Sequence, residues 1–468
     1  MSIHPKSALV LAAFAALLSS PAATAAVLCV RPGGSDADTG ACWDHAKATV
    51  QGAINAAAEG DEIWVAAGTY AEHVANRVVS EVPVNVALYG GFAGTETARS
   101  QRDVVAHRTI LDGTNSGIVV SITGGAGPAT RLDGFDVVRG YATGTTSYGG
   151  GIYILGSAPV IANNRIMSNL ADGAGGGMLV WAYRVVPPEA QAQILDNVIY
   201  GNRAADGGAG IAMVGASPEI RRNVVARNYT SGFGGGLGCW TTESAKICSP
   251  TIANNLIYEN SANFKDVGAL LGGGGIFASG HGLDGRAIAF GVSAPLVEDN
   301  VIAANGAVEK GGGIALVDSD IQAATILNNT IFANNGSAVY WSQTFPTIAN
   351  NIVAFNTWGL ERENEGATAA TVLANDVYGN AVRNAPADYK GIADQTGLGG
   401  NISADPRLVD YATGRFHIQS NSPCVGAGNA AYAGTGRTDI DGQARVQGAG
   451  WTSAPTSRTA RSGTRRFR

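Results

Sequence analysis

The stretch that decides the fold is ILNNTIFAN, residues 326–334, which returns 22 residues later as IANNIVAFN, residues 348–356. In each copy a branched aliphatic residue lies three positions before an asparagine, another lies two positions after it, and a second asparagine lies five positions after the first. Eight registers along the chain keep this spacing. Their first asparagines are Asn164, Asn197, Asn223, Asn255, Asn300, Asn329, Asn351 and Asn375. The chain is therefore a repeat protein, with insertions in its longer repeats.

The odd intervals within a repeat predict corners in the chain. Side chains of a strand alternate between its two faces. Two buried residues five positions apart therefore cannot lie on one face of an unbroken strand, and a bend must separate them. Asparagine tolerates the left-handed backbone conformation that a sharp bend needs, so we expect the first asparagine to adopt it. Another turn follows at the second asparagine.

Glycine clusters add a third strand to most repeats, as in GGGI at 149–152, GGGM at 175–178 and GGGL at 234–237. Glycine permits the positive φ with which the chain swings into that strand. Three short strands make one coil, and coils stack about 4.8 Å apart. Asparagines at equivalent corners then form amide ladders. A helical solenoid is excluded, because it needs amphipathic runs of about 10 residues or more.

Composition and the N-terminus indicate an exported globular protein. The 65 glycines and the low share of charged residues, 15%, argue against disorder. Lys6, the apolar run 8–18 and the small residues 23–25 form a signal-peptide pattern, so residues 1–25 are expected to be removed. That apolar run is too short to span a bilayer. We expect a secreted or cell-surface protein without a transmembrane segment.

The repeats resemble the right-handed parallel β-helix superfamily of pectate lyases and their relatives. Residues 118–378 carry the match, and VQGAINAAAEGD, residues 50–61, looks like the superfamily's entry motif. LYGGFAGTE, residues 88–96, is similar to exported bacterial cell-surface members. The resemblance implies an all-β, right-handed, single-stranded parallel β-helix. A short amphipathic helix would cap its open core before the first strand.

The resemblance also divides the chain. An N-terminal cap with the first coils spans 26–117, the repeats span 118–400, and a closing segment spans 401–450. In relatives the closing segment continues with a stretch like VDIGADE, whereas WTSAPTS follows here. The same codons read one base late give WTSAPTS. We therefore expect residues 451–468 to be a frameshift product, which resequencing the 3′ end of the gene tests.

The net charge of the chain limits the classes of binding partner that we expect. The net charge is −6, and leaving out Lys6 and the five arginines of the tail makes it −12. An acidic surface argues against nucleic acid as a partner. It also disfavours strongly anionic polysaccharides, unless Ca²⁺ bridges them.

Several polar residues are candidates for catalysis or metal binding, and each also has a purely structural interpretation. Asp318 and Asp320 are expected on one side of a strand end, as an acid pair or Ca²⁺ ligands. His281 lies in a loop tripeptide that faintly resembles one in related hydrolases. Solvated turn residues explain all three without a function.

Two further groups come from the glycine turns and the early repeats. Asp172 and Asp206 precede glycines in successive coils and would form a cation site if they stack. Turn chemistry explains them equally. Asp133, Asp136 and Arg139 form a compact acid–base cluster, or a surface ion pair.

A row of aromatic residues is the more distinctive candidate. If the residue after each glycine cluster points inward, Tyr153, Trp181, Trp240 and Phe277 point outward. Exposed rings along a solenoid provide a platform for sugar rings. The alternative is that long loops bury them.

The five cysteines include one plausible local disulfide, Cys29 with Cys42. The same counting places Cys239 inward. Its bridge to Cys248 is therefore doubtful, because a buried free thiol is equally reasonable.

Three functions remain open from the sequence. The first is non-catalytic binding of a glycan or another surface through the solenoid face. The second is a polysaccharide lyase or glycoside hydrolase with a divergent site. The third is a structural component of the cell envelope. The fold supports the second only by analogy.

Overall fold

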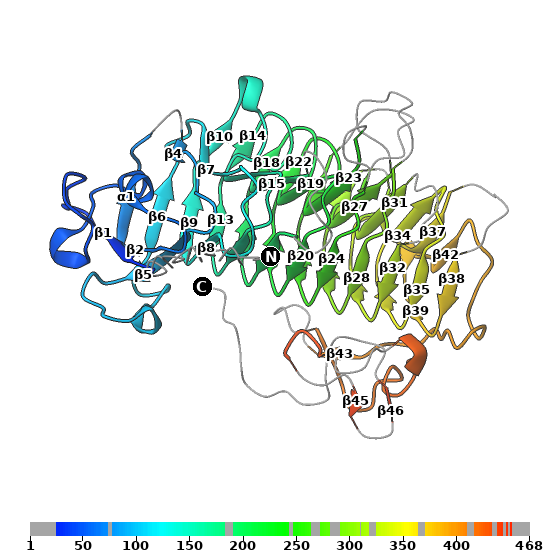
Figure 1. Ribbon diagram of the computed structural model, residues 1–468. Helices are drawn as coiled ribbons and strands as arrows, with labels where there is room; N and C mark the ends of the chain where they lie inside the picture. The colour runs from blue at the N-terminus through cyan, green and yellow to red at the C-terminus, as the bar shows by residue number, and fades with distance from the viewer. Residues whose placement is uncertain are drawn as a thin grey trace, which may run out of the picture.

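The computed structural model describes residues 25–73, 77–182, 191–242, 247–263, 272–280, 291–308, 310–317, 324–363, 370–409, 416–432, 438–442, 446–447 and 450–451. Within them the chain winds into a right-handed parallel β-helix whose coils follow one another along a single axis (Figure 1). The predicted fold class is confirmed.

Three long parallel sheets form the walls of the solenoid. We name them A, B and C in the order in which each coil enters them. Sheet A contains β1 (Val27–Val30), β2 (Glu62–Ala66), β5 (Ala87–Phe92), β8 (Arg131–Asp133), β12 (Val160–Ala162), β16 (Gln193–Leu195), β20 (Glu219–Arg221), β24 (Thr251–Ala253), β28 (Leu296–Glu298), β32 (Thr325–Leu327), β35 (Thr347–Ala349) and β38 (Thr371–Leu373). Sheet B contains β3 (Gly68–Tyr70), β6 (Thr109–Asp112), β9 (Phe135–Val138), β13 (Arg165–Met167), β17 (Val198–Tyr200), β21 (Val224–Ala226), β25 (Leu256–Tyr258), β29 (Val301–Ala303), β33 (Thr330–Phe332), β36 (Ile352–Ala354) and β39 (Asp376–Tyr378). Sheet C contains β4 (Arg77–Val79), β7 (Ile118–Ile122), β11 (Ile152–Leu155), β15 (Met178–Trp181), β19 (Ile211–Val214), β23 (Leu237–Trp240), β27 (Ile276–Ser279), β31 (Ile314–Val317), β34 (Ser337–Ser342), β37 (Trp358–Arg362) and β42 (Tyr389–Lys390).

A fourth, short sheet was not expected from the repeat. Sheet D has two-residue strands between the second asparagine and the glycine cluster. Its strands are β10 (Tyr141–Ala142), β14 (Leu170–Ala171), β18 (Arg203–Ala204), β22 (Tyr229–Thr230), β26 (Ser261–Ala262) and β30 (Gly306–Ala307). The glycine turn behaves as predicted: Gly175 has φ +72°, and a Cβ there would lie 2.5 Å from the Met178 carbonyl oxygen. Only glycine fits this turn into sheet C.

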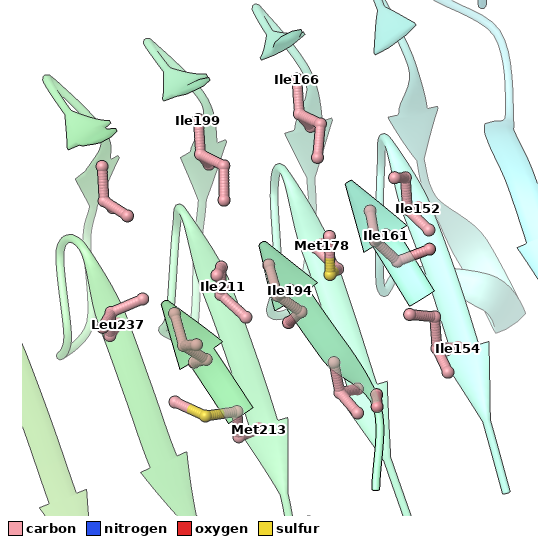
Figure 2. Packing of buried hydrophobic residues seen from close by; sticks show 14 of the residues in the cluster. Ile152, Ile154, Ile161, Ile166, Met178, Ile194, Ile199, Ile211, Met213 and Leu237 are labelled. Atoms are coloured by element: carbon pink, nitrogen blue, oxygen red, sulfur yellow. The ribbon is translucent and has the colours of Figure 1, made fainter. Parts of the chain in front are cut away.

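Like residues stack on like inside the solenoid. Ile152, Ile161 and Ile166 of one coil lie beside Met178, Ile194 and Ile199 of the next (Figure 2). All six are fully buried. Because each repeat places a branched side chain at the same point, one continuous hydrophobic core runs along the axis.

The asparagines form two ladders, but they do not occupy the left-handed positions. The main chain and Nδ2 of Asn197 donate to Asn223 Oδ1 of the next coil, and Nδ2 also donates to the Ile161 carbonyl. The residue before each ladder asparagine takes the positive φ instead, as at Asp196 (57°) and Arg222 (56°). The prediction that the first asparagine itself adopts this conformation is wrong. Asparagine is needed because its buried amide supplies one acceptor and two donors at once.

The ends of the core and of the ladders are capped. Helix α1 (Val50–Ala56) buries Val50, Ala53 and Ile54, which confirms the predicted capping helix. It does not precede the first strand, because β1 comes before it and pairs with β2. At the other end of the solenoid, each ladder ends on a side-chain acceptor. Asn401 Oδ1 accepts a hydrogen bond from Asn375 Nδ2, and Asp388 Oδ1 accepts one from Asn380 Nδ2. An aspartate can end the second ladder because the last position has to accept hydrogen bonds but has no further coil to donate to.

The closing segment turns back and runs beside the coils (Figure 1). It carries two short antiparallel pairs, β43 (Leu408–Val409) with β44 (His417–Ile418) and β45 (Val446–Gln447) with β46 (Gly450–Trp451). The remaining short elements are β40 (Ala381–Val382), β41 (Ala385–Pro386) and the 3-10 turns η1 (Trp43–His45), η2 (Arg99–Gln101), η3 (Gly144–Thr146) and η5 (Ala430–Tyr432).

Candidate functional site

The outer face of sheet C is the most distinctive surface of the solenoid. Along its strands, core residues alternate with residues that form a separate apolar cluster on the outside. We call this cluster the sheet C face. It consists of Tyr148, Tyr153, Ala174, Leu179, Trp181, Ala212, Val214, Phe233, Trp240, Phe277, Ala315, Val317 and Tyr340.

Only part of the predicted aromatic row is accessible. Tyr153 and Trp181 are half-buried, whereas Trp240 is 4% exposed and Phe277 is fully buried. The expectation that all four rings are exposed is therefore wrong for Trp240 and Phe277. Both pack against Phe233, whose ring centroid lies 5.6 Å from that of Trp240 and 4.5 Å from that of Phe277.

The accessible rings gather at the N-terminal part of the sheet C face. Tyr148, which precedes the glycine cluster of its coil, packs edge-on against Trp181 with ring centroids 6.2 Å apart. Tyr153 belongs to the same cluster, and burial raises the pKa of its hydroxyl. We call Tyr148, Tyr153 and Trp181 the ring site. Sequence reasoning missed Tyr148 because the turn before a glycine cluster has no fixed spacing.

The opposite end of sheet C is charged. Glu361 on β37 is buried, and its Oε1 lies 2.7 Å from Lys390 Nζ and 3.5 Å from Lys310 Nζ. Ser337 donates to its second oxygen. The lysines also lie over rings: Lys390 Nζ is 4.4 Å from the Trp358 centroid and Lys310 Nζ is 5.0 Å from that of Tyr340. No sequence signal distinguished these residues, because they come from different repeats.

The proposed cation pair does not stack. Ala171 pairs with Ala204 and Ala174 with Gly207, so Asp172 faces Ala205, one position away from Asp206. The Asp172 carboxylate accepts from the Tyr141 hydroxyl (3.0 Å) and the Thr143 hydroxyl (2.7 Å). These two aspartates do not fit a Ca²⁺ site. Within the described ranges there is no group of three or more histidine, cysteine, aspartate or glutamate side chains suited to a metal.

Asp133, Asp136 and Arg139 are brought into three different contacts. Asp133 is buried between Arg102 (2.6 Å) and Arg131 (2.5 Å). Asp136 accepts at 2.6 Å from the Nε of Arg108, which directly precedes the neighbouring strand β6 of sheet B. Arg139 pairs with Asp112, whose pKa is lowered because hydrogen bonds from Arg139 and Thr114 outweigh its burial. The expected acid–base cluster is therefore a set of structural ion pairs. Asp318, Asp320 and His281 lie outside the described residues.

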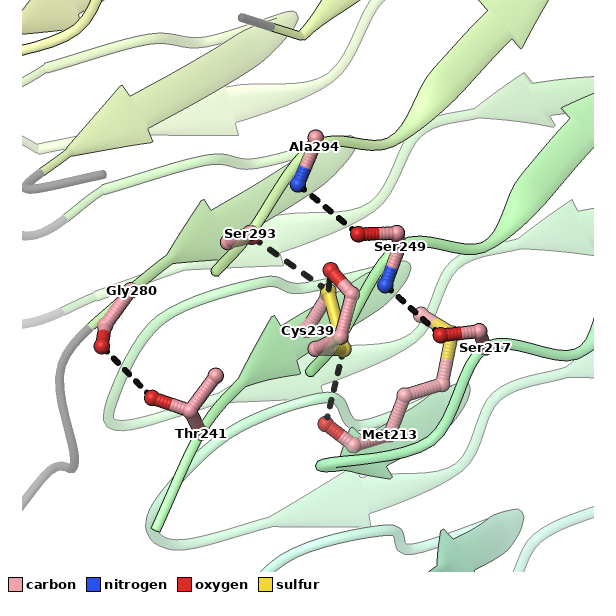
Figure 3. Close-up of a disulfide and its surroundings, with 9 residues drawn as sticks. Met213, Ser217, Cys239, Thr241, Ser249, Gly280, Ser293 and Ala294 are labelled. Carbon is pink, nitrogen blue, oxygen red and sulfur yellow. Dashed lines mark hydrogen bonds between the residues drawn. A yellow bond between two sulfur atoms is a disulfide. The ribbon is translucent and has the colours of Figure 1, made fainter. Parts of the chain in front are cut away.

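The cysteines differ from expectation at one pair. Cys239 and Cys248 form a disulfide, so the doubt about this bridge is resolved (Figure 3). The inward side chain of Cys239 on β23 reaches Cys248 because Cys248 also lies in the core. The Sγ atoms of Cys29 and Cys42 lie 2.7 Å apart, and their predicted disulfide stays a prediction. Cys424 is buried, and its thiol donates to Asp376 Oδ2 at 2.9 Å.

Comparison with known proteins agrees with this architecture. Residues 66–397 match the sequence profile of the family described as "Right handed beta helix region". The chain belongs to the right-handed β-helix family. This β-helix protein is also similar to a crystal structure of pectate lyase Pel9A, with a TM-score of 0.51 and 13% identity over 93% of this chain and 97% of that one. A rhamnogalacturonan lyase shares 14% identity over 75% of this chain and 87% of its own, with a TM-score of 0.33. No curated protein matches the sequence.

These likenesses concern the fold of the β-helix protein. At such low identity they transfer neither a substrate nor a catalytic residue. None of the helices in the described part of the chain is long and apolar enough to cross a membrane.

Proposed function

We propose that this β-helix protein is a secreted or cell-surface protein that binds glycans through the ring site without cleaving them. The observation that carries the proposal is the group of half-buried rings Tyr148, Tyr153 and Trp181 at one end of an otherwise buried apolar face. Aromatic rings that stay partly accessible offer the apolar surface on which a sugar ring packs. Scattered single rings would not form such a platform.

Charge supports an uncharged glycan. The chain carries a net charge of −6, so a polyuronate would be repelled at long range. Binding of a neutral chain depends on ring contact instead and is expected to change little with salt.

The enzymatic alternative has weaker support. The lysines nearest the sheet C face, Lys310 and Lys390, both pair with Glu361. Both ammonium groups are thus engaged in a structural ion pair. A lyase or hydrolase site would therefore need other residues.

One experiment tests both functions. The purified protein is incubated with a panel of neutral and anionic polysaccharides, with and without Ca²⁺, while binding, reducing ends and unsaturated products are measured. We expect binding without products. Trp181→Ala should weaken binding about tenfold, or about 1.4 kcal/mol. Tyr200→Ala, which removes a half-buried ring from sheet B, is the matched control. Release of products, or equal loss in both variants, would overturn the proposal.

A further inference from the structure

An exposed carboxylate, that of Asp172, borders the ring site. Asp172 directly follows β14 of sheet D, and residues 143–148 of the preceding coil lie around it and its neighbour Gly173. Gly173 donates its main-chain N–H to the Ser147 carbonyl at 2.8 Å. A Cβ at Gly173 would lie 2.6 Å from Cε1 of Tyr148, so that ring rests on the main chain next to Asp172. The carboxylate and the ring site therefore share one stretch of surface.

Two hydroxyl groups hold the Asp172 carboxylate in place. The Tyr141 hydroxyl donates to Oδ1 at 3.0 Å, and the Thr143 hydroxyl donates to Oδ2 at 2.7 Å. The hydrogen bond to Asp172 and its negative charge raise the pKa of the Tyr141 hydroxyl, which therefore stays protonated as a donor. Because each oxygen has its own donor, the carboxylate cannot rotate without losing both bonds. Its orientation beside the rings is fixed before any ligand arrives.

The same carboxylate keeps acceptor capacity that faces solvent. A carboxylate offers about four lone-pair sites, two on each oxygen. Among the residues that the structure describes, Tyr141 and Thr143 are the two whose side chains donate to Asp172. Asp172 and Thr143 are exposed, and Tyr141 is half-buried. A ligand lying on the surface can therefore reach one free acceptor position on each oxygen.

Two neutral donors match these positions best. An anionic group would be repelled by the carboxylate. A calcium ion takes six to eight oxygen ligands, and Asp206 of the next coil is out of register with Asp172. Hydroxyls on adjacent carbons of a sugar ring can donate together to the two oxygens of one carboxylate, as a guanidinium group does. The apolar face of the same sugar unit can pack on an aromatic ring.

We infer that Asp172 selects neutral glycans at the ring site, by accepting two adjacent hydroxyl groups of a sugar unit that packs on Tyr148 or Trp181. This inference rests on the proposed function and names the class of glycan that the site takes. Tyr141 and Thr143 are positioning residues, because they act on the ligand only through the carboxylate. The charge of Asp172 also acts at contact distance, where salt does not screen it, and so excludes a polyuronate more strictly than the net charge of the chain does.

Isothermal titration of the full chain with cellohexaose, xylohexaose, mannohexaose and hexagalacturonate tests the inference. We expect at least one of the three neutral hexasaccharides to bind. Asp172→Asn keeps the size of the side chain but removes its charge and replaces one acceptor by a donor. It should lower the affinity for the neutral hexasaccharide at least tenfold, and it should not lower the affinity for hexagalacturonate. A merely structural role of Asp172 would lower both affinities together.

Two further variants isolate the carboxylate. Tyr141→Phe keeps the ring and removes the hydroxyl that holds Oδ1, so we expect a loss of about threefold in affinity. Added to Asp172→Asn, the same change should have no further effect, because the positioned group is already gone. Asp196→Asn is the matched control, since its carboxylate pairs with Arg222 at a corner between sheets A and B. It should leave binding unchanged.

The possible failures of the two proposals differ. If none of these hexasaccharides and no polysaccharide of the wider panel binds, the proposed function fails, and the inference fails with it. If Trp181→Ala weakens the binding of a glycan but Asp172→Asn does not, only the inference is overturned. Equal losses in Asp172→Asn and Asp196→Asn, or binding of polysaccharides that includes none of the neutral hexasaccharides, would also overturn it. Binding of tetralysine that depends on Asp172, without binding of any hexasaccharide, would assign the carboxylate to a basic partner instead.

Discussion

Sheets B and C belong to the same coils, and each carries an apolar cluster on its outer face, but only the cluster on sheet B includes residues of the closing segment. The outer face of sheet B in the later coils is covered by the protein's own closing segment. Ile418 and Cys424 of that segment pack on Val301, Phe332 and Ile352. Among the described residues, none of the closing segment belongs to the sheet C face, which ends in half-buried rings on one side and in charged residues on the other. The protein therefore covers the sheet B face in its later coils with its own closing segment, whereas the sheet C face is the one on which we place the proposed glycan site.

Three of the residues that precede ladder asparagines bind the closing segment. Asn254, Asn328 and Asn350 have positive φ and donate from Nδ2 to carbonyls of Thr438, Tyr432 and Asn429. In an earlier coil the same position holds Asp196, which pairs with Arg222. Asn163 of a still earlier coil donates to Asp133 within the solenoid, so the partner of the corner residue, and not its type, marks contact with the closing segment.

Removing the closing segment should have the largest effect. Ending the chain after Pro406 keeps the ladder end at Asn401 but uncovers Phe332, Ile352 and their neighbours. Each large side chain returned to water costs about 1.5–3 kcal/mol, so we expect a large fall in melting temperature and strong binding of a hydrophobic dye. The full chain is the control. If the truncated protein melted at the same temperature as the full chain and bound no more dye, the closing segment would not be needed to cover sheet B.

Two buried rings allow the faces to be compared directly. Phe332→Ala on sheet B and Phe277→Ala on sheet C should each destabilise the protein by about 3–5 kcal/mol, because both rings are almost fully buried. Only Phe332 contacts the closing segment, with its centroid 6.3 Å from that of Phe416. Limited proteolysis should therefore cut the closing segment faster in Phe332→Ala alone. Equal cutting in both variants would contradict the assignment of the cover to sheet B.

The attachment of the closing segment should weaken as the pH rises. Asp376 is 1% exposed, and its pKa is raised to about 6, first by burial and then by Asp388 and Asp405. The Cys424 thiol and the Ala404 amide donate to it and act in the opposite direction. Because the folded state holds its proton more tightly than the unfolded chain, stability is full below about pH 4 and is lost up to about pH 6.

Denaturation at pH 4 and pH 7 checks this sign. We expect a loss of about 2–3 kcal/mol at the higher pH from this group. Asp376→Asn stays neutral and should remove that loss, whereas Asp405→Asn, close by in the closing segment, should remove only a small part. A difference between pH 4 and pH 7 that persists in Asp376→Asn would assign it to other groups.

The fold could be predicted because one spacing, repeated in every coil, fixes the corners, the core and both ladders. The error at the corner has a physical cause. The left-handed position is occupied by Asp196, Arg222 or Asn254 in different coils, so no single residue type marks it in the sequence. The constant asparagine beside it reports a buried hydrogen-bond set instead. The repeated asparagine therefore located the corner correctly, but the reason for its presence is the hydrogen-bond ladder and not the left-handed backbone.

The candidate site was predictable only in part. Alternation along sheet C gave the outward direction of Tyr153, Trp181, Trp240 and Phe277 correctly. Burial of two of them depends on Phe233 and on contacts between coils, which spacing along one strand does not contain. The charged residues at the other end of sheet C could not be predicted for the same reason, since Lys310, Glu361 and Lys390 meet only through the stacking of coils.

The smallest predicted effect tests the hydrogen bonds between the solenoid corners and the closing segment. Asn350 exchanges two hydrogen bonds with Asn429 of the closing segment, at 2.7 and 3.0 Å. Asn350→Gly keeps the left-handed backbone at little cost and removes only these bonds, so we expect a loss of about 1–2 kcal/mol. Asp196→Gly makes the same backbone change at a corner outside the cover, where it removes an exposed ion pair worth about 0–1 kcal/mol. Hydrogen exchange of the Asn429 amide should accelerate in the first variant alone, and equal acceleration in both would mean that the corner asparagines do not hold the closing segment.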